Sequence, residues 1–268
     1  MSCKNCISKS NGTPRGCNNN GACTSNSCNT FTVFDWLNDI AAPHDEPTFP
    51  FCEVRFKNGR KGYFKTNSIL LSVGDIVATQ SEKGHDIGVI TLLGELVRIQ
   101  MKKKNINHES KDTLSIYRIA SQKDIDVWQI SRDKEEDIKI RARKLALKLE
   151  LKMKISDAEY HGDGNKITFY YTANDRVDFR ELIRLFAREF KSRIEMKQVG
   201  LREEASRLGG IGSCGRELCC STWLHDFRAV NTSSARYQQL AINPEKLAGQ
   251  CGKLKCCLNY ELGTYLEA

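Results

Sequence analysis

The sequence lacks the features that mark membrane proteins, secreted proteins and several large enzyme classes. No apolar run approaches the roughly 18 residues of a membrane-spanning helix, and the N-terminal stretch Met1-Ser-Cys-Lys-Asn-Cys has no secretory character. The 5 histidines are scattered, and no phosphate-binding loop, dinucleotide fingerprint or nucleophile elbow is present. We therefore expect a cytoplasmic protein that has no membrane span and is not an enzyme.

The composition is that of a globular protein. Of the 268 residues, 40% are hydrophobic and 28% are charged, which is enough for two or three domains with cores of their own. The net charge of +8 permits an acidic partner such as RNA but does not demand one. Because a reducing cytoplasm disfavours disulfides, the 12 cysteines indicate metal sites or reactive thiols.

Half of the cysteines lie in two copies of one short pattern near the C-terminus. The copies read Gly212-Ser-Cys214-Gly-Arg-Glu-Leu-Cys219-Cys220 and Gly249-Gln-Cys251-Gly-Lys-Leu-Lys-Cys256-Cys257. We expect a helix to follow the first cysteine of each copy, over 216–227 and 253–262. Helix N-termini, flexible glycines and the basic residues of each copy would then stabilise thiolates, the form of cysteine that binds metals.

The chemistry of these six thiols leaves the metal open. A zinc site and an iron–sulfur cluster each take four thiolates, and chemistry alone favours neither. The reducing compartment disfavours disulfides. The spacing of the cysteines is not that of thioredoxin, so a thiol redox sensor is a weaker alternative. His225 is either an additional ligand or an ordinary helix residue.

The first part of the chain is predicted to be a cysteine-rich tail followed by a β-rich domain. Residues 1–50 are expected to form a flexible tail and a short helix at 31–40, which packs on its own domain or docks on a partner. The tail holds irregularly spaced cysteines that are either reactive thiols or a metal site: Cys3, Cys6, Cys17, Cys23 and Cys28. Period-two alternation then predicts strands within 51–112, with a hairpin at Asn58-Gly59, a strand over 86–101 broken at Gly94, and Cys52 in the core.

The middle of the chain, residues 113–200, has a clear order of elements. Strands are predicted at 114–120, 153–161, 166–173 and 194–199, with helices at 121–149 and 178–191. Ser121 can cap the first helix, whose acidic residues come early and whose basic residues come late, and Gly162-Asp-Gly-Asn165 suits a hairpin turn. The order β-α-β-β-α-β is that of a ferredoxin-like split βαβ unit. The expected fold class is therefore α+β: a small β-rich domain, a ferredoxin-like domain and a cysteine-rich helical segment over 201–268.

Basic residues form a stripe on each of the two predicted helices. These stripes are either solvated helix faces or a surface for RNA phosphates or an acidic protein, although no aromatic-rich RNA-recognition motif is present. The candidate surface residues are Arg141, Lys144, Lys148, Lys152, Arg180, Arg184, Arg188 and Lys191.

The cysteine patterns lie in longer stretches that resemble one bacterial family. The run Gly-Gly-Ile-Gly-Xaa-Cys-Gly-Arg-Xaa-Leu-Cys-Cys-Ser-Thr-Trp-Leu at 209–224 and the run from Asn243-Pro to Tyr-Glu261 are similar to the YaaT (RicT) family, as are Gly74-Asp-Ile-Val and Glu82-Lys-Gly upstream. This resemblance covers about 50–262 and implies a regulatory subunit of a small iron–sulfur complex. Such a subunit would act with small protein partners on an endoribonuclease and messenger RNA turnover. It would make the six motif cysteines candidate ligands of a [4Fe–4S] cluster. The alternative is a zinc-bearing RNA-binding module.

Overall fold

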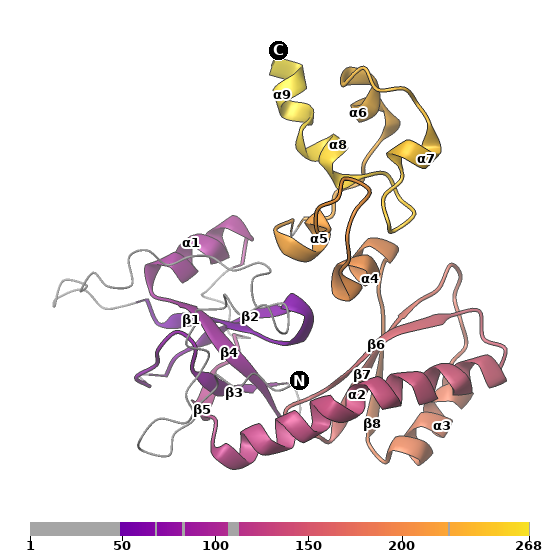
Figure 1. Cartoon of the computed structure of the whole chain (residues 1–268). Coiled ribbons are helices and arrows are strands. Elements are labelled where there is room, and N and C mark those ends of the chain that lie inside the picture. The colour runs from indigo at the N-terminus through magenta and orange to yellow at the C-terminus, as the bar shows by residue number, and fades with distance from the viewer. Residues whose placement is uncertain (1–48, 68, 82–83, 107–112, 225, 268) are drawn as a thin grey trace.

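The protein is an α+β protein with two β-sheets and a helical C-terminal segment, which confirms the predicted fold class (Figure 1). The computed structural model describes residues 49–67, 69–81, 84–106, 113–224 and 226–267. The predictions for the N-terminal tail, for its cysteines and helix at 31–40, and for His225 therefore lie outside the described residues. No helix among those residues is long and apolar enough to cross a membrane.

The first sheet has five strands in the order β2-β1-β4-β3-β5. Alternating side chains of β1 bury Cys52 and Val54 in its core, as the period-two pattern predicts. The turn between β1 and β2 contains Asn58 and Gly59, both at positive φ, which confirms the predicted hairpin. The strands are β1 (Phe51–Arg55), β2 (Lys61–Lys65), β3 (Ile76–Gln80), β4 (His85–Leu93) and β5 (Ile116–Ile119).

The prediction of strand from residue 95 to residue 101 was wrong, because α1 (Glu95–Lys103) occupies this stretch. Gly94 adopts a φ of 68°, where glycine is favoured, and this ends β4. Val97 and Met101 then lie one helical turn apart and are both buried beside Phe51 of the first sheet. Their spacing of four residues is the helical signal that the alternation within β4 obscured.

The second sheet has three strands in the order β6-β7-β8, and α2 and α3 cover one of its faces (Figure 1). Its core includes Phe169 of β7 and Phe186 of α3, whose ring centroids lie 4.7 Å apart. Helix α2 begins at Ser121 in a capping box with Asp124, as the predicted N-cap requires. The elements are α2 (Gln122–Lys148), β6 (Lys154–Tyr160), β7 (Lys166–Thr172), α3 (Arg180–Phe190) and β8 (Arg193–Gln198).

All six elements of the expected ferredoxin-like unit form, but the first strand joins the other sheet. β5 pairs with β3 of the first sheet. In a ferredoxin-like sheet this strand would lie between β7 and β8. Here β7 and β8 pair directly and in parallel. The 27 residues of α2 span roughly 40 Å and carry the chain from one sheet to the other. Within β5, Ile116 is buried in the core of the first sheet, which anchors the strand there.

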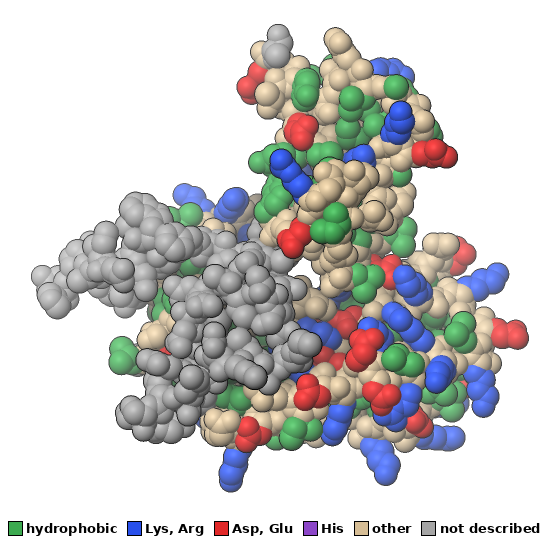
Figure 2. Space-filling view, viewed as in Figure 1, with side chains coloured by type: hydrophobic (Ala, Val, Ile, Leu, Met, Phe, Trp, Pro, Cys, Tyr) green, Lys and Arg blue, Asp and Glu red, His purple; other side chains and the backbone are tan. Residues whose placement is uncertain are grey.

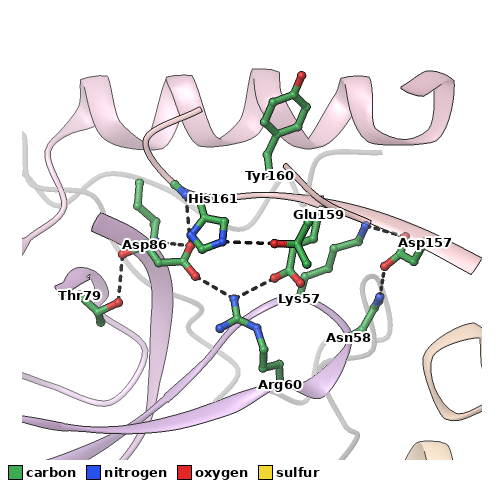
Figure 3. A network of polar contacts seen from close by, with 12 residues as sticks. Lys57, Asn58, Arg60, Thr79, Asp86, Asp157, Glu159, Tyr160 and His161 are labelled. Carbon is green, nitrogen blue, oxygen red and sulfur yellow. Dashed lines mark hydrogen bonds and ion pairs between the residues drawn. The ribbon is translucent and has the colours of Figure 1, made fainter. Parts of the chain in front are cut away.

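Buried ion pairs connect the β1–β2 turn with the second sheet and α2. Lys57 Nζ lies 2.7 Å from Glu135 of α2 and 3.0 Å from Asp157 of β6. Figure 3 shows Lys57 beside Asp157, and Arg60 reaching toward Glu159 and Asp86. Burial raises the pKa of Glu135 although Lys57 opposes that rise. These contacts fix the turn of the first sheet against the second.

The C-terminal segment begins with α4 on the second sheet and continues as short helices. Glu204 of α4 accepts a hydrogen bond from Ser156 of β6 at 2.9 Å, and the Arg207 guanidinium lies over the Tyr170 ring at 3.7 Å. A small core of Ala235, Leu247 and Leu258 packs beyond it. The helices are α4 (Leu201–Leu208), α5 (Cys219–Thr222), α6 (Thr232–Tyr237), α7 (Pro244–Leu247), α8 (Cys256–Tyr260) and α9 (Leu262–Glu267).

Candidate metal centre

The two cysteine patterns form the same local structure twice. We call residues 211–223 the first repeat and residues 248–260 the second repeat. Each repeat begins with a tight hairpin, closed by the bridge between Ile211 and Glu217 in one and between Ala248 and Leu254 in the other. The hairpin hydrogen bonds match, since Gly212 N donates to Arg216 O at 2.8 Å and Gly249 N donates to Lys253 O at 2.7 Å. The repeated sequence therefore encodes a repeated structure.

The glycine after the first cysteine is explained by backbone geometry. Gly215 and Gly252 have φ angles of 79° and 73°, in the left-handed region that favours glycine. Their amides donate back to Gly212 O at 2.9 Å and Gly249 O at 3.0 Å, which closes each turn. A side chain at either position would strain the turn that carries the first cysteine.

The helices of both repeats begin later than predicted, at the cysteine pair. Helix α5 starts at Cys219 and α8 at Cys256, whereas the pattern predicted helices from residues 216 and 253. The residues before them, Leu218 and Lys255, have ψ angles of 130° and 135°, because each still belongs to the hairpin. The first cysteine of each repeat therefore sits in a hairpin rather than next to a helix N-terminus.

The equivalent aromatic residues after the cysteine pairs meet. Trp223 ends the first repeat and Tyr260 ends the second, and their ring centroids lie 4.5 Å apart at an interplanar angle of 62°. Both side chains remain about half exposed. The two repeats thus pack as matching halves, with α5 against α8.

All six motif cysteines line one cavity between the two repeats. The cavity has a volume of about 160 Å³, and its wall also includes Arg202 and Ala205 of α4. Cys220 is buried and Cys214 is exposed, while the other four are partly buried. The structure therefore brings together every cysteine that the sequence selected, and it places Cys52 in the distant core of the first sheet, as predicted.

Burial opposes ionisation of three of these thiols. It raises the pKa of Cys220 to about 11, with smaller contributions from the neighbouring Cys256 and Cys251. Burial also raises the pKa of Cys257. It raises the pKa of Cys256 as well, although the Arg202 guanidinium opposes part of this rise. At Cys256 and Cys257, burial therefore outweighs the nearby positive charge of the Arg202 and Lys255 side chains.

The donor set surrounds a space larger than a single ion needs. Within the described ranges, no three histidine, cysteine, aspartate or glutamate side chains are close enough together to hold one metal ion. A zinc site gathers four sulfurs at about 2.3 Å from one ion, whereas a cluster bonds its thiolates to separate iron atoms. The cysteines on the wall of this cavity fit the second requirement better.

The cavity contains one charged residue that the sequence did not reveal. Arg202, on α4, is only 8% exposed and lines the cavity beside the cysteines. It precedes the first repeat by several residues, and no local pattern distinguishes it from the other basic residues of the chain. Only the packing of α4 against both repeats brings it to the site.

The predicted basic surface lies on α2, α3 and the residues that follow each helix. All eight side chains are exposed, and the two helices are neighbours, but some of the side chains are already paired. Arg141 pairs with Asp137 and with Glu189 of α3, and Arg180 lies 3.6 Å from Asp178. Figure 2 shows Lys and Arg interspersed with Asp and Glu over this part of the surface. The positive charge is therefore diluted rather than continuous.

Comparison with known proteins gives matches over most of the chain. The PSP1 C-terminal conserved region matches residues 114–199, and the third domain of PSP1-like proteins matches residues 229–268. Stage 0 sporulation protein YaaT of Bacillus subtilis (strain 168) is 38% identical over 217 residues, which are 80% of this chain and 76% of that protein.

Two yeast proteins match smaller parts. An uncharacterized protein of Schizosaccharomyces pombe is 29% identical over 172 residues, which are 53% of this chain and 22% of that protein. Protein PSP1 of Saccharomyces cerevisiae is 45% identical over 47 residues, 18% of this chain and 6% of that protein. No solved structure matches the chain.

Proposed function

The chain belongs to the YaaT family of proteins with a PSP1 C-terminal region, and from this premise we propose that it is a regulatory subunit rather than an enzyme. In this proposal it carries a [4Fe–4S] cluster in the cavity between its two repeats. It acts through small protein partners in the cytoplasm on an endoribonuclease and so on RNA turnover. The observation that carries the proposal is the convergence of all six motif cysteines on one cavity.

The size of the cavity and the spread of its sulfurs favour a cluster over a single zinc ion. Four thiolates are enough for one cluster, and six cysteines line the wall. Because a cysteine must lose its proton to bind metal, cluster binding and proton release are linked in this proposal.

A regulatory role requires surfaces for partners, and the structure offers two. The rings of Trp223 and Tyr260 end the two repeats, contact each other and remain about half exposed, which suits them to the apolar patch of a partner protein. The basic residues of α2 and α3 suit an acidic protein surface. The relative in Bacillus subtilis is called a stage 0 sporulation protein, which supports a developmental role in control rather than catalysis.

The metal is tested on full-length protein purified without air. We expect brown protein that absorbs near about 400 nm and contains iron and sulfide, as thiolate-bound clusters do. Colourless protein with one tightly held zinc and no sulfide would replace the cluster with the zinc site. Protein that holds no metal, and whose cysteines cycle between thiol and disulfide, would support the redox sensor instead.

The second candidate function is direct RNA binding, and the exposed basic residues on two neighbouring helices favour it. It is tested by filter binding of the metal-loaded protein to mixed RNA at two salt concentrations. If RNA phosphates bind there, affinity should fall steeply with salt, and a variant with Arg141, Lys144, Arg184 and Arg188 changed to alanine should show a shallower salt slope. We expect weak binding that this variant does not change, because neighbouring carboxylates already pair with Arg141.

A further inference from the structure

We propose that the buried guanidinium of Arg202 is the counter-ion of the anionic metal–thiolate group in the cavity and donates a hydrogen bond from Nε to one of its sulfurs. The proposal rests on the proposed function. It assigns to α4 a role in setting the reduction potential and the retention of the metal group. Substituting a cysteine would not test that role.

The guanidinium is held in place by neutral groups alone. Nη1 donates to the carbonyl oxygen of Arg228 at 2.9 Å, and Nη2 donates to the carbonyl oxygen of Leu254, in the hairpin of the second repeat, at 2.9 Å. Nε is buried and has no hydrogen-bond partner. In the described part of the chain, no carboxylate forms an ion pair with this side chain, and it is only 8% exposed.

A buried cation without an anion is strongly destabilising, so this arrangement calls for negative charge nearby. Arg207, a largely buried arginine of the same helix, has a carboxylate and an aromatic ring beside it, since it lies 3.6 Å from Glu203 and over the Tyr170 ring, although its Nε and Nη1 also lack hydrogen-bond partners. Arg202 has neither kind of contact. What lies beside it instead is the wall of cysteines.

The cavity would supply the missing charge once its cysteines bind metal. Four thiolates carry more negative charge than the core they bind offsets, so the whole group is anionic. The two carbonyl contacts fix the plane of the guanidinium and leave Nε as its buried nitrogen that has no hydrogen-bond partner. Arg202 also joins α4 to the second repeat through Leu254, so its position depends on the same fold that brings the repeats together.

Two effects should follow from this contact. A positive charge and a hydrogen bond at sulfur favour the reduced, more negative cluster, so Arg202 should raise the reduction potential. It should also retain the metal group more tightly, because substitutions of residues that support metal ligands typically weaken metal affinity by about 10- to 100-fold.

The test compares full-length, cluster-loaded variants prepared without air. Arg202→Met removes the charge and all donors at similar length, and Arg202→Lys keeps the charge but loses the planar donor set. Arg207→Lys is the matched control, because Arg207 is a buried arginine of the same helix that does not line the cavity. The readouts are the midpoint potential and the resistance of the bound iron to a chelator.

We expect Arg202→Met to shift the potential to more negative values and to weaken iron retention by about 10- to 100-fold. Arg202→Lys should lie between this variant and the wild type, and Arg207→Lys should match the wild type. If Arg202→Met does not fold, the potential of Arg202→Lys decides, because a purely structural role would lower the cluster content without moving the potential of the clusters that remain.

Two outcomes would overturn the inference, and they can be told apart. If both Arg202 variants keep the potential and chelator resistance of a wild type that holds iron and sulfide, Arg202 is not the counter-ion and the proposed function still stands. If the wild type itself binds no metal, the proposed function fails and this inference fails with it.

Discussion

Replacing Arg60 by methionine should weaken the junction between the two sheets by an amount that the structure allows us to estimate. Arg60 Nη2 lies 2.7 Å from Asp86 of β4 and 2.9 Å from Glu159 of β6. Both carboxylates are buried, with exposed fractions of 6% and 5%. The Tyr170 hydroxyl also donates to Glu159 at 2.8 Å, so that carboxylate would keep one partner.

Removing one member of a buried charge pair costs about 3–5 kcal/mol, because the other member is left without compensation. The Arg60 side chain is 34% exposed, so water can reach the vacated site and the lower end applies. We therefore expect Arg60→Met to lower the free energy of unfolding by about 3 kcal/mol. Arg141→Met serves as the control, because that arginine is paired only on the surface and its loss should be too small to resolve.

The assay is urea unfolding followed by far-ultraviolet circular dichroism, with a double-mutant cycle between Arg60→Met and Glu159→Gln. The two changes should be strongly non-additive, because the second removes the charge that the first leaves unpaired. The reasoning is refuted if Arg60→Met costs less than about 1 kcal/mol, the value of an exposed pair, or if the two changes are additive.

Three further predictions concern the helix cap, acid stability and thiol reactivity. Because Ser121 caps α2, Ser121→Ala should lower the free energy of unfolding in urea by about 1 kcal/mol, and aspartate at this position should restore most of that loss. Equal stability of the wild type, Ser121→Ala and Ser121→Asp would contradict this prediction. Burial pushes the pKa of Glu159 upward, but the Arg60 guanidinium overcomes this and holds it below its ordinary range. The stabilisation that ionised Glu159 supplies is therefore present above that range and is lost as the pH falls through the lowered pKa. The urea midpoint of Glu159→Gln should accordingly fall less steeply in acid than that of the wild type. Equal slopes for the two proteins would contradict the pairing. Burial raises the pKa of Cys52 to about 12, so alkylation mapped by mass spectrometry in metal-free protein should label the exposed Cys214 well before Cys52, which should react only on unfolding. Early labelling of Cys52 would contradict its burial.

The elements that the sequence predicted well are those specified by local signals. Helix α2 was predicted from a serine cap and a long stretch with acidic residues early and basic residues late, and it forms with that cap. The hairpins at Asn58-Gly59 and between β6 and β7 follow from turn residues that tolerate positive φ. These features depend on residues only a few positions apart, so one sequence is enough to find them.

The features that the sequence missed depend on distant contacts. Nothing near Ile116 indicates whether β5 pairs within its own unit or with β3, because strand pairing is decided by sheet edges elsewhere in the chain. Val97 and Met101 have helical spacing but follow a strand whose apolar residues alternate strongly. Only their burial beside Phe51 shows that this stretch has the period of a helix and not that of a strand.

The candidate site divides in the same way. The repeat in the sequence was enough to select the six cysteines that lie together, because both copies form one hairpin-and-helix unit. The raised pKa of Cys220 and the position of Arg202 arise from the packing of α4 and the two repeats, which no local pattern records.

The most direct test of the central claim is the iron and sulfide content of Cys251→Ser, measured beside Cys52→Ser in full-length protein prepared without air. Cys251 lines the cavity, whereas Cys52 lies in the core of the first sheet. We predict that Cys52→Ser keeps the iron and sulfide of the wild type while Cys251→Ser loses them and becomes more sensitive to protease after Gly209, because metal binding there is also folding energy. Full iron and sulfide content in Cys251→Ser would contradict the assignment of a metal centre to the two repeats.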